Sequence, residues 1–250
     1  MALQEEFESQ GNFLFRHRSI LPLVIIIVGL FVFSINRYLG ITYDLTLPYS
    51  TLEYCCLGVC LFGLFIRVYT VGYTPANTSG RNTHDQVADT LNTTGIYSVV
   101  RHPLYVGNFF MWLGIALMTE KGWFVVSFIL MYWLYYERIM YAEEQFLRRK
   151  FGENYLNWAA KTPAVFFSFK NKKKPNYPFS WKKVLKKEKN GLLAIFILLY
   201  IFHTIADSID SQYFQPEMNW LAFATLICGL SYMILKFMKK KTNLLNEAGR

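Results

Sequence analysis

One short run of the sequence brings together Arg101, His102 and Pro103, with Tyr105 and Gly107 just after them, where a polar stretch turns apolar. Because proline lacks an amide hydrogen and its fixed φ suits the first turn of a helix, we expect a helix to begin at Pro103 with His102 near its cap. The unpaired amides and the positive dipole end of such a helix bind anions. Arg101 adds a guanidinium group beside them. The run therefore predicts a binding site for an anion such as a carboxylate.

A second run places two carboxylates, Glu143 and Glu144, ahead of Phe151, Gly152 and Tyr155. Carboxylates in a segment dominated by lysine and arginine suit an amino group or sugar hydroxyls, and they suit equally the role of solvated partners of the arginines that follow them. Neighbouring residues on a helix point about 100° apart. We therefore expect one glutamate to face the site, with Glu144 preferred, and the other to pair with a basic neighbour.

Taken in order, Arg-His-Pro-x-Tyr, an apolar hairpin, Glu-Glu and Phe-Gly-x-x-Tyr resemble the isoprenylcysteine carboxyl methyltransferase family and its phospholipid methyltransferase relatives over about residues 95–163. The resemblance implies a helical membrane enzyme that transfers a methyl group from S-adenosylmethionine, with Arg101 and Glu144 as catalytic residues. It implies that the cofactor is bound by His102, Pro103, Tyr105, Gly107, Glu143 and Tyr155. We expect no metal site. The chain departs from the family pattern at Trp158 and Lys161, where many members carry a second tyrosine and an arginine.

The composition of the chain is that of a membrane protein. Of its 250 residues, 53% are hydrophobic and 17% are charged, too few charges for the surface of a soluble domain of that length. The excess apolar surface must therefore face lipid. The formal charge of +9 is not accompanied by aromatic residues interleaved with basic ones in a soluble domain, which argues against nucleic acid as the partner. We expect the basic residues to contact anionic lipid headgroups instead.

Six apolar stretches predict an all-α polytopic membrane protein. A helix needs about 20 apolar residues to cross the hydrocarbon core of a bilayer. The expected transmembrane helices cover residues 20–39, 52–71, 104–118, 123–136, 191–209 and 220–238. The third and fourth are short and close together, so we expect a helical hairpin, followed by a charged helix that breaks at Gly152. The expected units are a tail 1–19, two helices 20–73, a methyltransferase core 74–190 and a C-terminal pair of helices 191–250.

The distribution of basic residues predicts the orientation in the membrane. With the N-terminus inside, the segments 40–51, 119–122 and 210–219 lie outside and hold one basic residue, Lys121. The inner segments hold most of the others, fourteen of them between residues 137 and 190. We therefore expect an integral protein of a bacterial inner membrane, with both termini in the cytoplasm and the site at the cytoplasmic face.

Three ionisable side chains fall inside the expected transmembrane helices. Arg67 lies near the inner end of the second one, where we expect it to extend toward the membrane interface, with contact to the substrate as the alternative. His203 and Asp207 are one helical turn apart and face the same side, so we expect a structural hydrogen-bonded pair.

The expected reaction is methyl transfer to a membrane lipid or a lipidated substrate. A carboxylate or phosphate acceptor is already ionised at neutral pH and needs no base, whereas a protonated amine must first lose a proton. Beyond Glu143, Glu144 and His102 the sequence offers no convincing buried base, which favours an anionic acceptor, either a lipid phosphate or a prenylcysteine carboxylate. The loop 78–83, which contains Arg81, would suit a phosphate.

Three other functions stay open on the sequence. A phospholipid amine N-methyltransferase shares the same motifs. An NADPH-dependent membrane reductase of the sterol type has a similar helical core and is distinguished by hydride transfer. A transporter or a scaffold is the weakest alternative, because transporters carry broken helices at matched positions of two halves, and the sequence shows no such symmetry.

Overall fold

The computed structural model describes residues 2–41, 48–75, 86–214, 216–247 and 249, so the loop 78–83 with Arg81 lies outside the described residues. The described part of the chain contains eight α-helices, one 3-10 turn (Ile96–Ser98) and no strand, which confirms the all-α class. The helices are α1 (Leu3–Arg16), α2 (Ile20–Tyr38), α3 (Tyr49–Tyr73), α4 (Pro103–Leu117), α5 (Gly122–Phe151), α6 (Glu153–Ala159), α7 (Trp181–Ser211) and α8 (Trp220–Lys241).

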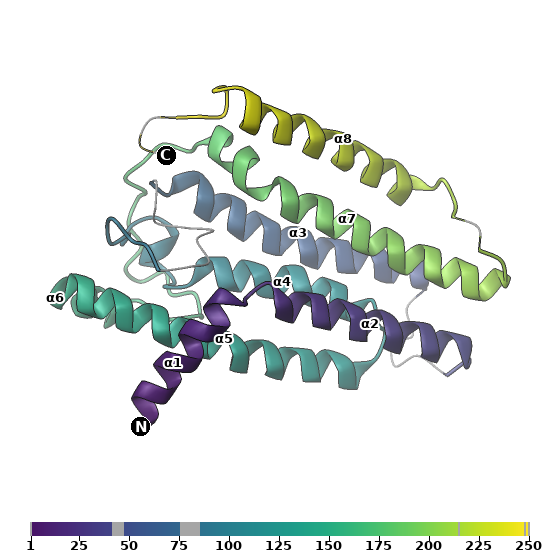
Figure 1. The fold of residues 1–250 in the computed structure, drawn as a ribbon, viewed down its shortest axis with the longest axis horizontal. Coiled ribbons are helices and arrows are strands. Elements are labelled where there is room, and N and C mark those ends of the chain that lie inside the picture. The colour runs from purple at the N-terminus through teal and green to yellow at the C-terminus, as the bar shows by residue number, and fades with distance from the viewer. Residues whose placement is uncertain (1, 42–47, 76–85, 215, 248, 250) are drawn as a thin grey trace.

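Six of the helices run lengthwise in one bundle, while α1 crosses α5 at an angle and α6 lies at the end of α5 (Figure 1). Each stretch expected to span the membrane forms one of the lengthwise helices. By length and composition α3, α7 and α8 are able to cross a membrane, and α4 and Pro22–Tyr38 of α2 are shorter apolar helices. The chain is therefore an integral membrane protein.

Glycines set the close packing of α3 against α4. A Cβ atom at Gly107 would lie 2.6 Å from Cγ of Arg67 and 2.9 Å from the carbonyl oxygen of Gly63. One at Gly114 would lie 2.6 Å from the carbonyl oxygen of Cys56. Because real Cβ atoms do not approach other atoms this closely, any larger residue would push the helices apart. Gly107 thus holds the start of α4 against the second half of α3, and Gly114 holds the end of α4 against the first half of α3.

Two elements extend beyond the limits expected from the sequence. The segment 1–19, expected as a tail, contains α1, and Gly11 packs so closely on α5 that a Cβ atom there would lie 2.7 Å from Cβ of Ala142. Helix α7 begins ahead of its apolar stretch because Ser180 caps it, accepting a hydrogen bond from the Lys183 amide at 3.1 Å. The predicted break after α5 is confirmed at Gly152, where φ is 53°.

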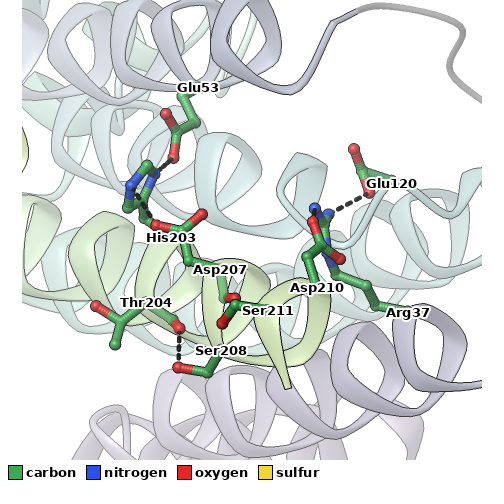
Figure 2. A network of polar contacts seen from close by, with 9 residues as sticks. All are labelled: Arg37, Glu53, Glu120, His203, Thr204, Asp207, Ser208, Asp210 and Ser211. Carbon is green, nitrogen blue, oxygen red and sulfur yellow. Dashed lines mark hydrogen bonds and ion pairs between the residues drawn. The ribbon is translucent and has the colours of Figure 1, made fainter. Parts of the chain in front are cut away.

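A group of charged side chains, here called the distal cluster, lies at the end of the bundle opposite the first turn of α4. The end of α2, the start of α3 and the end of α7 meet there. The distal cluster consists of Arg37, Glu53, Glu120, His203, Asp207 and Asp210 (Figure 2). The ring of His203 lies between two carboxylates, with Nδ1 2.6 Å from Glu53 and Nε2 2.9 Å from Asp207. The predicted pair of His203 and Asp207 is therefore confirmed, and Glu53 joins it.

The distal cluster gives carboxylate partners to Arg37, a basic residue that the expected topology places at the outer end of the first transmembrane helix. Arg37 forms an ion pair with Asp210 and lies 4.0 Å from Glu120. Glu120 belongs to the turn between α4 and α5, which the sequence placed in an outer loop, yet Thr119, Glu120 and Lys121 are all buried. The turn is covered by the bundle because Arg37 neutralises the carboxylate that it brings inside.

Candidate active site

The loop that precedes α4 is held in place by a later segment of the chain that runs antiparallel to it. The amide of His102 donates to the carbonyl of Ala164 at 3.1 Å, and the amide of Gly95 donates to the carbonyl of Lys173 at 3.2 Å. Gly95 has a φ of 60°, a conformation that other residues rarely adopt, so it makes the turn without strain. The loop is therefore fixed along its length by backbone hydrogen bonds.

Helix α4 begins at Pro103 with His102 as its N-cap, as predicted. The hydroxyl of Tyr132, on α5, donates to the carbonyl of Tyr105 at 2.7 Å. The Tyr105 ring stacks on the imidazole of His102, with centroids 5.7 Å apart and an interplanar angle of 18°. The first turn of α4 thus places His102 against a rigid aromatic wall.

Charged side chains from α5 and the loop meet at the head of α4. In His102, Nδ1 lies 3.4 Å from Oε2 of Glu143, and Nε2 lies 2.9 Å from Oε1 of Glu144. Nε of Arg101 lies 3.0 Å from the same oxygen of Glu144, and its NH1 donates to the carbonyl of Ala159 at 3.0 Å. A neutral imidazole has a single N–H, so contact of both ring nitrogens with carboxylates is the arrangement of an imidazolium.

The pKa values of the two central groups agree with that arrangement. Burial works to lower the pKa of His102, but its hydrogen bonds with Glu143 and Glu144 and their charges outweigh burial and raise it to about 9. Burial works to raise the pKa of Glu144, yet the His102 hydrogen bond and the charges of His102 and Arg101 hold it below its ordinary value. Both groups are therefore charged at neutral pH.

A cavity of about 240 Å³ opens beside these charges. Ligand cavities commonly measure about 300–1,000 Å³, so this one is close to the lower end of the range. It combines the two runs that the sequence singled out, and its lining includes Arg101, His102, Pro103, Tyr105, Glu143, Glu144 and Tyr155. Residues more than 40 positions apart in the chain therefore share one cavity.

Two expectations about individual residues need correction. Both Glu143 and Glu144 line the cavity, as the resemblance implied, whereas helical periodicity alone led us to expect only one of them there. The imidazole of His102 presents nitrogens on opposite edges, so it contacts both carboxylates although the two side chains diverge. Gly107, expected to bind the cofactor, is not among the lining residues; it lies in the interface with α3, beneath Arg67.

Other lining residues were missed or were given another role. Arg67 does not extend away toward the interface: it donates to both carboxylate oxygens of Glu188, at 2.7 and 2.8 Å, and to the side chain of Asn108 at 2.6 Å. Trp158, noted only as a departure from the family pattern, donates its indole N–H to the carbonyl of Tyr97 at 2.9 Å. No local pattern marks these contacts in the sequence, because each joins segments far apart in the chain.

The donor set of the cavity fits S-adenosylmethionine, which carries a carboxylate, an ammonium group, a sulfonium, ribose hydroxyls and an aromatic base. Arg101 and the first turn of α4 suit the carboxylate, and Glu143 and Glu144 suit the ammonium group or the hydroxyls. The buried hydroxyl of Tyr155 lies beside Glu144 and helps to lower the pKa of that carboxyl, so it adds a neutral polar group to the same wall of the cavity.

Known proteins share the part of the chain that forms this cavity. Residues 54–154 match the family model described as phospholipid methyltransferase. The nickel-cobalt-cadmium resistance protein NccN of Alcaligenes xylosoxydans xylosoxydans is 39% identical over 88 residues, 35% of this chain and 38% of that protein. The protein-S-isoprenylcysteine O-methyltransferase of Xenopus laevis is 38% identical over 74 residues, 30% of this chain and 26% of that protein.

Each match covers only part of this chain and of the similar protein. The cobalt-zinc-cadmium resistance protein CzcN of Cupriavidus metallidurans is 40% identical over 78 residues, and the chain spans 36% of that protein's length. No solved structure matches the chain. The resemblance drawn from the two motifs is supported by these matches: residues 54–154 are similar to the phospholipid methyltransferase family, and isoprenylcysteine O-methyltransferases are among the similar proteins.

Proposed function

We propose that the protein transfers a methyl group from S-adenosylmethionine to an anionic lipid or lipidated acceptor at the cytoplasmic face of the membrane. The observation that carries this proposal is the meeting of both motifs in one cavity at the end of the bundle. Arg101, His102, Glu143 and Glu144 are charged there and contact one another, and an aromatic wall adjoins them. The similarity to phospholipid methyltransferases and to isoprenylcysteine O-methyltransferases supports the same conclusion.

When bound, S-adenosylmethionine supplies a methyl group activated by a sulfonium. The residues of the chain then have to bind the cofactor and the acceptor, orient them and exclude water. Proximity and orientation are able to lower the activation barrier by about 7–11 kcal/mol. His102 fixes Glu143 and Glu144, so both carboxylates keep one geometry without a ligand. Arg101 is fixed in turn by Glu144 and by the Ala159 carbonyl. This preorganisation removes the entropic cost of ordering four charged side chains.

The charge of the cavity favours an anionic acceptor. Its lining carries positive charge on Arg18, Arg67, Arg101 and Lys187 and on protonated His102, and negative charge on Glu143, Glu144 and Glu188. The lining thus has an excess of two positive charges before a cationic sulfonium is added. A carboxylate or phosphate offsets this excess, whereas an ammonium group adds to it. An anionic acceptor also needs no base, which agrees with the use of His102, Glu143 and Glu144 in ion pairs with one another.

The cytoplasmic location rests on the distribution of charge along the bundle. Fourteen lysines and arginines lie between residues 137 and 190, in segments at the cavity end. At the other end Arg37 is paired with carboxylates. A single cysteine at Asn92, which lines the cavity, or at Lys173 should react with a membrane-impermeant thiol reagent only after permeabilisation. Labelling of Asn92 in intact cells would contradict both the orientation and a bacterial inner membrane protein with cytoplasmic termini.

The proposed activity is tested by incubating the purified protein with methyl-labelled S-adenosylmethionine and fractionated membrane lipids, and by identifying the labelled species. We expect the label on oxygen: a methyl carboxylate ester releases labelled methanol in mild base, whereas a methyl phosphate diester resists base and is identified by mass spectrometry of the labelled lipid. A label that mass spectrometry places on an amine nitrogen would replace the anionic acceptor by a phospholipid amine. The absence of any labelled lipid, with hydride transfer from NADPH instead, would contradict methyl transfer itself.

A further inference from the structure

Arg67 and Glu188 form a second polar site on the wall of the cavity, apart from the charges around His102. Nε and NH2 of Arg67 donate to the two oxygens of Glu188, and NH1 donates to Asn108. Both residues line the cavity, and the Glu188 side chain is only 5% exposed. The guanidinium group has five N–H donors, and these three bonds use three of them. Two N–H groups of Arg67 therefore have no acceptor among the described residues.

The position of Arg67 is fixed from three sides. Glu188 and Asn108 hold the guanidinium group, and the absence of a side chain at Gly107 lets the arginine stem lie flat on α4, where a Cβ atom would approach Cγ to 2.6 Å. Arg67 and Glu143 line the same cavity. Arg67 is therefore preorganised in the cavity that holds the groups that we assign to the cofactor.

Glu188 comes from a part of the chain that the family does not account for. The matched segment ends at residue 154, whereas Glu188 belongs to the first turns of α7. The same turns are anchored to the end of α3, because Nζ of Lys183 donates to the carbonyls of Thr74 at 2.6 Å and Pro75 at 2.8 Å. The early start of α7 thus places a carboxylate of its own against an arginine of the shared segment.

We infer that Arg67, held by Glu188, is the subsite for the anionic oxygen of the acceptor, and that α7 sets acceptor selectivity through the Glu188 carboxylate. The inference rests on the proposed function and adds the residues that recognise the acceptor. The recognised chemistry is a carboxylate or phosphate on an amphiphile. Glu188 neutralises the guanidinium group, so it orients Arg67 and at the same time limits how strongly an anion binds.

This arrangement predicts opposite effects for the two members of the pair. Replacing Glu188 by Gln keeps one oxygen acceptor for Arg67 but removes the competing negative charge, so anion affinity should rise about threefold to tenfold. Replacing Arg67 by Lys keeps the charge but loses the fork of donors, so anion affinity should fall about tenfold. If Glu188 were instead the recognition group for an ammonium acceptor, Glu188→Gln would abolish binding and Arg67→Lys would spare it.

The test measures equilibrium binding to the full-length protein in neutral detergent without cofactor, by tryptophan fluorescence. The probes are dodecyl phosphate, N-acetyl-S-dodecyl-cysteine and dodecylamine, which separate a phosphate, a carboxylate and an ammonium group on the same chain length. Glu153→Gln is the matched control, because it removes an exposed cytoplasmic carboxylate that does not line the cavity. We expect one or both anionic probes to bind, and their affinity to change in the stated directions only in the Arg67 and Glu188 variants.

Binding of dodecylamine alone, or equal anion affinity in the wild type, Arg67→Lys and Glu188→Gln, would overturn the inference. Thermal unfolding of each variant shows whether it is folded, and Glu188→Gln keeps the test decisive because an increase in affinity does not result from misfolding. The measurement needs no turnover, so it separates the two proposals. Anion binding through Arg67 without methyl transfer would contradict the proposed function alone, and methyl transfer with unaltered anion binding in both variants would contradict this inference alone.

Discussion

Two histidines, at opposite ends of the bundle, are each held between two carboxylates with an arginine close by. His102 contacts Glu143 and Glu144 beside Arg101, and His203 contacts Glu53 and Asp207 in the cluster that includes Arg37. Both rings are largely enclosed, because the His102 side chain is 5% exposed and that of His203 is 18% exposed.

The difference lies in what adjoins each cluster. The carboxylates around His102 face a cavity, whereas the residues around His203 are packed between α2, α3 and α7 (Figure 2). The same combination of residue types therefore lines a cavity at one end of the bundle and joins helices at the other. Types and spacing predict that charges will pair; only the packing decides whether a ligand is able to reach them.

The largest effect should come from breaking the distal cluster. Glu53→Ala leaves His203 without one of its buried partners, and breaking a buried ion pair from one side costs about 3–5 kcal/mol. Thermal or denaturant unfolding in detergent measures this loss. Glu137→Ala is the matched control, because Glu137 is exposed and pairs only with its neighbour Arg138, and it should change stability by less than about 0.5 kcal/mol. Equal stability of the two variants would remove the structural role of the cluster.

The next effect concerns activity and should appear only at the cavity. His102→Ala releases both glutamates from their fixed geometry, and misplacement of this kind lowers turnover about 100-fold. His203→Ala should leave the turnover of the folded fraction within about threefold of the wild type, because no lining residue contacts it. Methyl transfer per folded molecule is the measurement. A comparable loss in both variants would mean that the two clusters are coupled.

A smaller effect should follow pH. The pKa of His102 is raised to about 9 in the folded protein. Its contribution to the free energy of unfolding is therefore complete below the ordinary pKa near 6.5 and is lost as pH rises through about 9. The pKa of Glu144 is lowered, so its contribution to the free energy of unfolding is present above the ordinary carboxyl pKa and is lost as pH falls through the lowered pKa. Affinity for S-adenosylmethionine, relative to that of His102→Gln, should be constant from about pH 5 to 7 and fall about tenfold by pH 10. A ratio that rises with pH would contradict the imidazolium.

The smallest effect should come from the contact that ties α6 to the loop. Trp158→Phe keeps the ring but loses the hydrogen bond to the Tyr97 carbonyl, a loss of about 1 kcal/mol or about fivefold in cofactor affinity. Trp123→Phe removes an indole that is exposed at the other end of the bundle and should have no effect on that affinity. Calorimetric titration compares the two. If Trp123→Phe had the larger effect, the anchoring of the loop by α6 would not limit binding.

The sequence predicted what depends on neighbours along the chain. Pro103 marks the start of α4 and Gly152 the end of α5, because each imposes a local backbone conformation. His102 and Glu144 were predicted for the site because they belong to ordered motifs. The pairing of Glu53 with His203, 150 residues away, was not predicted, because nothing in either local pattern specifies the other.

The same limit applies within the site. Arg67 and Glu188 are 121 residues apart, and their contact depends on an early start of α7 that its apolar stretch does not mark. Gly107 was assigned to the cofactor on resemblance alone, whereas packing against Arg67 explains the absence of a side chain there. Both glutamates line the cavity because the His102 ring lies between them, which helical periodicity alone does not show.

The central claim, that the cavity at the head of α4 binds S-adenosylmethionine, is tested most directly by calorimetric titration of the purified protein with that cofactor and with NADPH. The measurement is made on the wild type, on Glu144→Gln and on Glu53→Gln, which make the same chemical change in the two clusters. We predict binding of S-adenosylmethionine at one site per chain, at least about tenfold weaker binding in Glu144→Gln and unchanged binding in Glu53→Gln. Binding of NADPH alone, or wild-type affinity for S-adenosylmethionine in Glu144→Gln with a loss in Glu53→Gln, would contradict it.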